Sequence, residues 1–415
     1  MATSAPAEFI DPAADVRDEI AAASGMPELP EKIWFHKTAA AVIDADRCIR
    51  CGGCIAACPS RSINVGEDGR PTLVQMCTGC SACWDYCPMG GLRTERLASV
   101  LDGQADSANE WGVLGEVLDA SSARAAARVE SAQDGGVVTA LLSKLLKDEV
   151  IDGAIVNRPD GVFAGNPVLA RTEDELRACA GSVYAQSQAL VELNSPLPED
   201  VGRLAFVGTP CQVSVLRALQ RFPWRYRQTA ADAVVLTVAL FCTRSFDGDK
   251  LAEALAATGV DVTRLARIDV RAGEMIGWAQ GGEELLRLPV RDIRSAALRG
   301  CAECADFAGR SADIAVGSIG SDPGWTTVLA RTDAGRAAMQ SAASALEVKP
   351  APDLELVAKL ATRDQRGAER ALERDFDPTG ELWISYPDHI AAYAGTSRAA
   401  AAPPAYRSQH YQVSC

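Results

Sequence analysis

The chain has 415 residues, of which 48% are hydrophobic and 23% charged, and its formal net charge is −14. These proportions are those of a globular protein with a sizeable core, and the length favours two or three domains over one. The acidic balance argues against nucleic acid as a partner, because a nucleic-acid interface needs a basic surface.

Residues 1–37 form a leader ahead of the first motif. Its first half is Ala-rich and acidic, without the basic start and apolar centre of a signal peptide. Its last part carries Trp34 and Phe35, which we expect to pack on the rest of the protein. The longest apolar run of the chain, residues 233–242, is ten residues long and is interrupted by a threonine. It therefore predicts a buried strand and no membrane span.

Residues 38–98 contain a cysteine repeat. Two copies of C-x2-C-x2-C-x3-C-P follow each other, and each cysteine of the second copy lies 29 residues after its counterpart. The eight positions are Cys48, Cys51, Cys54 and Cys58, then Cys77, Cys80, Cys83 and Cys87. An internal repeat of four ligand positions is hard to obtain by chance.

This spacing predicts two 4Fe-4S clusters. Three cysteines at intervals of three wrap one cluster, and the fourth, which precedes Pro, ligates the other. The predicted ligand sets are Cys48, Cys51, Cys54 and Cys87, and Cys77, Cys80, Cys83 and Cys58. Two zinc sites would also use eight cysteines, but zinc-binding pairs usually stand far apart in sequence. The segment resembles bacterial two-cluster ferredoxins over about residues 40–95.

Four further segments follow the cysteine repeat. Residues 99–130 are expected to be a connector, with a helical pattern over 111–128. The body divides into residues 131–200 and residues 201–391. Residues 392–415 form a tail rich in Ala, Pro and Ser, a composition that favours mobility.

Hydrophobic periodicity and turn residues predict alternating helices and strands in the body. Helices are expected at 137–146, 172–180, 212–220, 249–257, 334–346 and 354–360. Strands are expected at 151–156, 204–207, 233–241, 266–270, 285–290, 313–316 and 326–330. The predicted fold class is α/β (α+β), with a ferredoxin-like βαβ-repeat module fused to a mixed α/β body.

Four of the six remaining cysteines occupy places suited to metal binding. Cys211 opens a helix, Cys242 ends a strand, and Cys301 and Cys304 form a C-x2-C pair. A thiolate is favoured at a helix N-terminus, and a C-x2-C pair supplies half of a cluster's ligands. Spacing alone leaves two interpretations open, a third 4Fe-4S cluster or ordinary buried cysteines.

Two glycine-rich turns adjoin these elements. Gln133-Asp134-Gly135-Gly136 precedes a helix and makes a ready anion site, whereas residues 317–325 follow a strand. Each is a weak signal by itself, since both are also compatible with plain turns. No G-x-G-x-x-G follows a strand, so a Rossmann dinucleotide site is not indicated.

In combination, these motifs resemble the coenzyme F-420 (F420) hydrogenase/dehydrogenase beta-subunit family over about residues 120–360. The motifs are Gln133 to Leu142, Ile151 to Ala154, Gly208 to Gln212, Phe241-Cys242, Cys301 to Phe307, Gly317 to Gly320 and Gly324-Trp325. The resemblance implies a flavoprotein with FAD beside a 4Fe-4S cluster. It also implies the ligands of this third cluster, Cys211, Cys242, Cys301 and Cys304.

The resemblance further places FAD near the two glycine-rich turns. The implied cofactor-binding residues are Gln133, Asp134, Gly135, Gly136, Thr139, Ser182, Tyr184, Gly208, Thr209, Gly317, Ser318, Gly320, Gly324 and Trp325. The chain departs from the family at Val183, where many members carry Lys in a Gly-Ser-Lys-Tyr motif. The loss of this cation leaves the identity of the anionic substrate open.

The expected function is that of an iron-sulfur flavoprotein oxidoreductase that passes electrons between reduced F420 and one-electron carriers. One alternative is a ferredoxin-dependent reductase of another organic substrate, and another is the electron-input beta subunit of a hydrogenase or formate dehydrogenase complex. The expected partners are therefore F420 or another organic redox substrate, and a ferredoxin or a redox partner subunit. Hydride transfer requires no side-chain acid or base, so no catalytic residue is assigned. We expect a cytoplasmic protein, since no export signal is present.

A basic cluster stands out in this acidic chain. It consists of Arg217, Arg221, Arg225 and Arg227. The cluster is either the solvated end of a helix or a site that attracts the anionic tail of F420 or an acidic partner.

Overall fold

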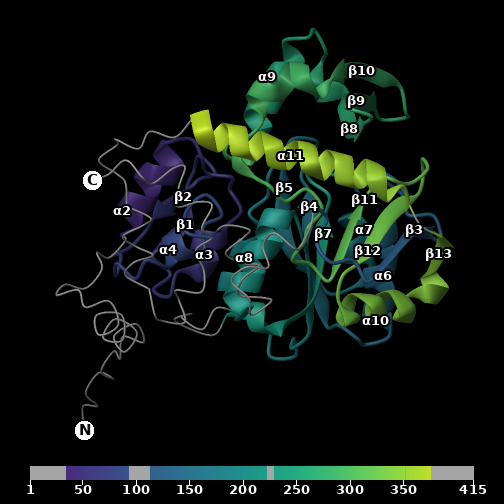
Figure 1. Ribbon diagram of the computed structural model, residues 1–415, viewed down its shortest axis with the longest axis horizontal. Helices are drawn as coiled ribbons and strands as arrows, with labels where there is room; N and C mark the ends of the chain where they lie inside the picture. Colours follow the sequence, from purple (N-terminus) through teal and green to yellow (C-terminus); the bar gives the residue numbers. More distant parts are fainter. Residues whose placement is uncertain (1–33, 93–112, 222–228, 351, 375–415) are drawn as a thin grey trace.

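The computed structural model describes residues 34–92, 113–221, 229–350 and 352–374. Most of the expected leader, the expected tail and two of the clustered arginines, Arg225 and Arg227, lie outside these residues. The described segments form a dicluster module with a two-stranded sheet, a body around an eight-stranded sheet, and a separate three-stranded sheet (Figure 1). This arrangement confirms the predicted mixed α/β fold class.

The central sheet has the strand order β13-β3-β12-β11-β7-β6-β4-β5. Its strands are β3 (Asp119–Ala125), β4 (Gly153–Pro159), β5 (Gly165–Ala170), β6 (Leu204–Gly208), β7 (Val234–Leu240), β11 (Ile314–Gly317), β12 (Thr326–Ala330) and β13 (Leu346–Pro350). The four inner strands β4, β6, β7 and β11 pair in parallel. Antiparallel strands extend the sheet at both edges, β5 at one and β12, β3 and β13 at the other.

Alternating side chains of the inner strands build a core on each face of this sheet. In β6, Ala205 and Val207 face a cluster with helices α6 (Val137–Lys147), α7 (Glu173–Ala178) and α10 (Asp333–Ser341). Leu204 and Phe206 face the opposite cluster, with α8 (Pro210–Arg221) and the dicluster module. A strand buried on both faces is typical of a parallel sheet covered by helices.

The dicluster module spans the purple region of Figure 1. Its elements are α2 (Phe35–Thr38), the π-helix η1 (Ala39–Asp44), α3 (Gly53–Ala57), β1 (Ile63–Val65), β2 (Pro71–Leu73) and α4 (Ala82–Asp85). Strands β1 and β2 form an antiparallel hairpin between the two cysteine groups. Phe35 is buried as expected, and the ring of Trp34 lies so close to Gly79 that a Cβ there would touch it.

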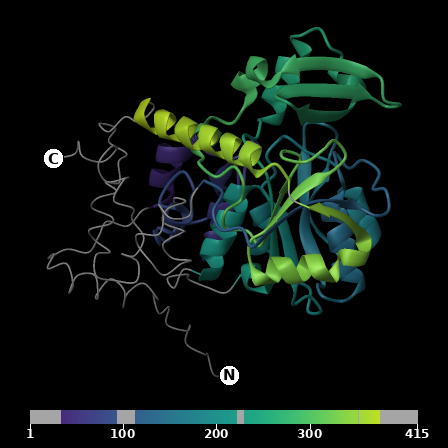
Figure 2. The same ribbon diagram turned by 45° about the vertical axis from the view of Figure 1, so that its right-hand side comes forward.

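A second small sheet and a long helix complete the structure. The remaining elements are η3 (Ala189–Asn194), η4 (Ala230–Ala233), α9 (Gly248–Ala256), η5 (Val262–Arg264), β8 (Leu265–Arg271), β9 (Glu274–Ala279), β10 (Glu284–Pro289), η6 (Val290–Ala296), η7 (Arg299–Glu303), η8 (Ala343–Ala345) and α11 (Leu354–Arg374). Strands β8, β9 and β10 form an antiparallel sheet. Helix α11 runs between this sheet and the body toward the dicluster module (Figure 2).

Two secondary-structure predictions were wrong. Residues 119–125, expected within a helical connector, form β3, which pairs with β12 and β13 inside the central sheet. This strand is rich in Ala and Ser, which have little intrinsic preference for a strand. Its conformation is therefore set by pairing with the neighbouring strands. The helix expected at 334–346 ends at Ser341, and β13 begins at Leu346.

Candidate functional site

The two halves of the cysteine repeat adopt the same local backbone. Arg50 and Gly52 in the first half, and Gly79 and Ser81 in the second, all have positive φ. These positions are again 29 residues apart. The Arg50 amide lies 3.4 Å from Cys48 Sγ, and the Gly79 amide lies 3.4 Å from Cys77 Sγ. The loops thus curl around the sulfurs with backbone donors inward, which suits a 4Fe-4S site because such donors stabilise cluster sulfur.

The cysteines predicted to share a cluster come together across the repeat. Burial is the largest cause of the raised pKa of Cys54, followed by the charges of Cys51, Cys48 and Cys87 and then by that of Cys83 from the other group. Burial likewise raises the pKa of Cys83, as do the charges of Cys80, Cys77 and Cys58. Each fourth cysteine therefore stands with the other half of the repeat.

The four body cysteines also converge, although they come from distant segments. Cys211 lies in the first turn of α8, Cys242 follows β7, and Cys301 and Cys304 belong to or cap η7. Burial, then the charges of the other three cysteines, raise the pKa of Cys242. Burial also raises the pKa of Cys211, Cys301 and Cys304 to about 12. Four half-buried thiols that lie close to one another fit the cationic core of an iron-sulfur cluster, since bound iron stabilises thiolates that desolvation disfavours.

One cysteine of the module lies beside this body group. After burial, the charge of Cys211 is the next cause that raises the pKa of Cys51. Both cysteines also adjoin the same hydrophobic cluster. Helices α3 and α8, which begin next to them, pack against each other. The body group therefore adjoins the module through the group of Cys48, Cys51, Cys54 and Cys87.

The cysteines stand too far apart for a single ion. Among the described residues, no three His, Cys, Asp or Glu side chains surround one metal ion, and every described cysteine is free of a disulfide. The ligands of a four-iron cube stand farther apart than those of a single ion, because each sulfur binds a different iron.

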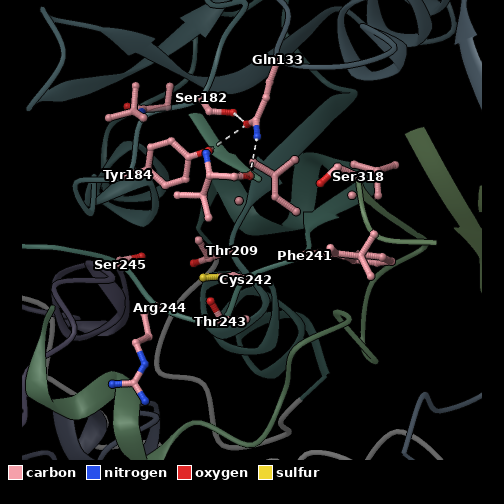
Figure 3. A pocket seen from close by; sticks show the side chains of 18 of the residues that line it. Gln133, Ser182, Tyr184, Thr209, Phe241, Cys242, Thr243, Arg244, Ser245 and Ser318 are labelled. Atoms are coloured by element: carbon pink, nitrogen blue, oxygen red, sulfur yellow. Dashed lines mark hydrogen bonds between the residues drawn. The ribbon is translucent and has the colours of Figure 1, made fainter. Parts of the chain in front are cut away.

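A cavity of about 760 Å³ opens beside the body cysteines (Figure 3). Its wall includes Cys242, Cys301 and Cys304. It also includes ten of the residues implied for FAD, Gln133, Asp134, Gly136, Thr139, Ser182, Tyr184, Gly208, Thr209, Gly317 and Ser318. Binding cavities for cofactors and similar molecules usually measure about 300–1,000 Å³. The structure thus brings most of the predicted residues to one space next to the thiols.

The other four implied residues do not line this cavity. They are Gly135, Gly320, Gly324 and Trp325. The Trp325 ring lies under two cations, with Arg124 at 4.7 Å and Lys349 at 3.9 Å from its centre. Gly135 donates its amide to Thr326 Oγ1 at 3.2 Å. These residues shape the sheet edge and the turns that adjoin the cavity wall.

Hydrogen bonds fix one end of the cavity. Gln133 accepts from the hydroxyls of Ser182 and Tyr184, the latter at 3.1 Å (Figure 3). The Tyr184 hydroxyl accepts in turn from the Val270 amide at 2.7 Å. Burial raises the pKa of Tyr184 well above its usual range, so its hydroxyl stays protonated and can donate. The departure from the family motif, Val183, lines the same end.

Sequence reasoning missed the charged residues of the wall. Four arginines and one further aspartate line the cavity, Arg244, Arg291, Arg294, Arg363 and Asp364. They come from the loop after β7, from η6 and from α11, so no motif joins them. Three buried polar atoms of the wall, Asn157 Oδ1, Gln186 Nε2 and Asp364 Oδ2, have no hydrogen-bond partner among the described residues. Buried polar atoms are normally paired, so these three are available to a polar ligand in the cavity.

Arg217, which the sequence placed in a possible anion-binding cluster, belongs to the core. Its guanidinium lies 2.7 Å from Asp313 and donates to Thr237 Oγ1 at 2.9 Å and to the Ser311 carbonyl at 3.0 Å. Its side chain is 13% exposed. Both interpretations of this residue were wrong, because the arginine neither caps a solvated helix end nor faces a ligand.

The family of the chain is clear from comparison with known proteins. Residues 120–194 match the model of the N-terminal region of the coenzyme F420 hydrogenase/dehydrogenase beta subunit. Residues 201–353 match the model of the C-terminal region of the same beta subunit, and residues 41–93 match a 4Fe-4S dicluster domain. The chain therefore belongs to the coenzyme F420 hydrogenase/dehydrogenase beta-subunit family, as the motifs predicted, with a dicluster domain at its N-terminal side.

Individual relatives share this architecture to different extents. The coenzyme F420 hydrogenase subunit beta of Methanothermobacter thermautotrophicus is 32% identical, over 62% of this chain and 95% of its own length. The coenzyme F420-dependent sulfite reductase of Methanocaldococcus jannaschii is 30% identical over 80% of this chain, which spans only 51% of that protein. One subunit of the F(420)H(2) dehydrogenase of Methanosarcina mazei is 27% identical, over 79% of this chain and 92% of its own length.

A solved structure has the same body fold. A chain of the F420-reducing nickel-iron hydrogenase complex from Methanosarcina barkeri is similar with a TM-score of 0.59 and 28% identity. The match covers 63% of this chain and 93% of that chain. None of the helices in the described segments combines the length and the apolarity needed to cross a membrane.

Proposed function

We propose that this protein is an iron-sulfur flavoprotein oxidoreductase that passes electrons between F420 and one-electron carriers. The observation that carries the proposal is the cavity of about 760 Å³ whose wall includes three of the four converging body thiols. A redox cofactor in this cavity would lie directly beside a cluster held by those thiols. The names of the relatives, which include F420 hydrogenase and sulfite reductase, support F420 as the hydride carrier.

The cavity wall fits FAD. Gly136 caps helix α6 with a φ of 67°, so the helix N-terminus opens at the wall and suits a pyrophosphate. The unpartnered polar atoms offer further hydrogen bonds to a polar ligand. When bound, a flavin supplies the exchange between hydride and single electrons. The residues that would hold it are Gln133, Thr139, Ser182, Tyr184 and Thr209.

Other wall residues keep the site dry and attract the substrate. The rings of Phe241 and Phe307 stand 5.2 Å apart and give the wall an apolar surface next to the thiols. Arg291 and Arg294 lie exposed on η6 at the cavity. F420 carries a phosphate and a glutamate tail, and arginines are well suited to such anions. In this proposal, Arg291 and Arg294 supply the positive charge that many family members have as Lys at the position of Val183.

Anaerobic mixing tests the proposal directly. Reduced F420 should bleach the flavin absorption of the purified protein within a stopped-flow experiment, and cluster reduction should follow. A flavin that dithionite bleaches but F420 leaves oxidised would refute the proposal. The function would then be that of a ferredoxin-dependent reductase of another substrate. The Val at position 183, where many family members have Lys, favours this alternative. Co-purification with a hydrogenase-type partner would instead favour an electron-input subunit.

Reversing Arg291 and Arg294 to Glu should raise the KM for F420 by about tenfold, or about 1.4 kcal/mol, because two attractive charges become repulsive. The effect should shrink as salt is added, since salt screens exposed charges. Steady-state kinetics at two salt concentrations measure both. The control reverses Arg264 of η5 and Arg287 of β10, two exposed arginines that do not line the cavity. An equal rise in KM in the control would show that only net charge matters.

A further inference from the structure

The dicluster module and the body share one hydrophobic core. Trp84 and Tyr86 of the module are fully buried in the same cluster as Leu190 of η3 and Val215 of α8. Helix α3 packs against both η3 and α8. A module joined to the body only by a flexible linker would keep its own separate core.

A buried ion pair joins the cysteine loops across this interface. Arg47 Nε donates to Glu303 Oε1 at 2.7 Å, and Arg47 Nη2 donates to Glu303 Oε2 at 2.6 Å. The two side chains are only 9% and 8% exposed. Arg47 directly precedes Cys48, and Glu303 stands between Cys301 and Cys304. The bidentate pair thus connects a loop of the inner module group to the loop of the body group.

A second ion pair repeats the connection. Arg50, between Cys48 and Cys51, lies 2.5 Å from Asp247. Asp247 caps the N-terminus of α9, where it accepts from the Lys250 amide at 3.2 Å. Both arginines of the first cysteine loop are therefore tied to acids of the body.

Glycines let the module and the body approach each other closely. A Cβ on Gly300, next to Cys301, would collide with the carbonyl of Arg47. A Cβ on Gly52 would lie 3.1 Å from the Gln188 carbonyl, and one on Gly53 would lie 2.9 Å from Val215. A spacer of even one methyl group would move the loops apart.

We propose that the Arg47–Glu303 pair is a positioning clamp that holds the body group and the inner group of the module, Cys48, Cys51, Cys54 and Cys87, at a fixed separation. The module is then a rigid relay and not a tethered carrier. The outer group, Cys58, Cys77, Cys80 and Cys83, is the end that meets a one-electron partner. An electron that passes between the two groups oxidises one cluster by one electron and reduces the next by one electron. No bond is made or broken. The inference rests on the proposed function only in that it assigns clusters to these cysteines.

Arg47→Gln tests the clamp. The substitution removes the positive charge and one of the two hydrogen-bond donors to Glu303, but it keeps much of the length of the side chain. The clusters are reduced chemically with titanium(III) citrate, so the measurement does not depend on F420. Electron paramagnetic resonance then reports the magnetic interaction between neighbouring reduced clusters. A Cys301→Ser variant without the body cluster defines the part of that interaction which belongs to the body–module contact.

Arg47→Gln should keep its full iron content but lose most of this body–module interaction. Electron transfer from the body to the module should slow by on the order of tenfold, since small displacements strongly affect steps that depend on geometry. Arg47→Lys, which keeps the charge without the fork, should fall between parent and Arg47→Gln. Arg124→Gln, the same change in the exposed pair with Glu347, should match the parent.

A parent-like interaction and rate in Arg47→Gln would overturn the proposal. If Arg47→Gln loses iron, Gly300→Ala decides, because it keeps both charges and separates the loops by an added methyl group. The same loss of interaction is expected there, and a parent-like spectrum would overturn the clamp. A protein that shows the interaction but does not react with F420 would refute the proposed function and leave the clamp intact.

Discussion

Anaerobically purified protein should contain about twelve irons per chain, and Cys301→Ser should lower this number to about eight. Cys301 is one of four half-buried cysteines that converge from α8, the end of β7 and η7. Removing one thiolate from a four-iron cube leaves an iron without its protein ligand, so this cluster should be lost. Iron analysis measures the change, and the spectra of the dicluster module should stay intact.

The matched control for Cys301→Ser is Cys179→Ser. Cys179 caps the end of α7, and the charges that act on its pKa come from Arg158 and Glu175 and not from another cysteine. This variant should keep about twelve irons. About eight irons in the fully loaded parent would contradict the third cluster, and stoichiometric zinc would contradict all three.

Arg217→Met should destabilise the protein by about 3–5 kcal/mol, because it leaves Asp313 charged and buried without its counter-ion. The Asp313 carboxylate also accepts from the amide of Thr237 at 2.8 Å and from Thr332 Oγ1 at 2.7 Å. It therefore holds β7, β11 and the start of α10 together. The midpoint of anaerobic urea unfolding measures the loss, with each variant compared under the same cluster loading.

Arg221→Met provides the comparison within the same helix. Arg221 is exposed at the end of α8, and surface changes of this kind usually alter stability by less than about 0.5 kcal/mol. Neither variant should change the KM for F420. A raised KM with normal stability in Arg217→Met would return this arginine to an anion-binding role.

The dicluster module could be predicted from sequence because its chemistry is local. The ligand spacing, the Pro after each fourth cysteine and the repeat of 29 residues are all visible within one short segment. The crossed grouping of Cys58 and Cys87 is a prediction from the same spacing. The body cysteines needed the family resemblance, since Cys211 and Cys304 are far apart in the chain.

The rest of the site is not local and could not be predicted in the same way. Arg244, Arg294 and Arg363 reach the cavity from three separate elements, and nothing in their sequence neighbourhoods distinguishes them from other surface arginines. Strand β3 is similar in this respect, because its small side chains form a strand only between β12 and β13. Whether these arginines line the cavity, and whether residues 119–125 form a strand, depends on their tertiary neighbours more than on their residue types.

A core shared by module and body ties the loading of iron to the order of synthesis. Once Trp84 and Tyr86 are packed in one core with Leu190 and Val215, Cys51 of the inner group is buried in the same core. About 130 residues separate Cys87 from the end of α8, so a ribosome that adds about 5–20 residues per second takes on the order of ten seconds to supply that partner surface. The nascent module has this interval in which its cysteines remain open to an iron-sulfur donor.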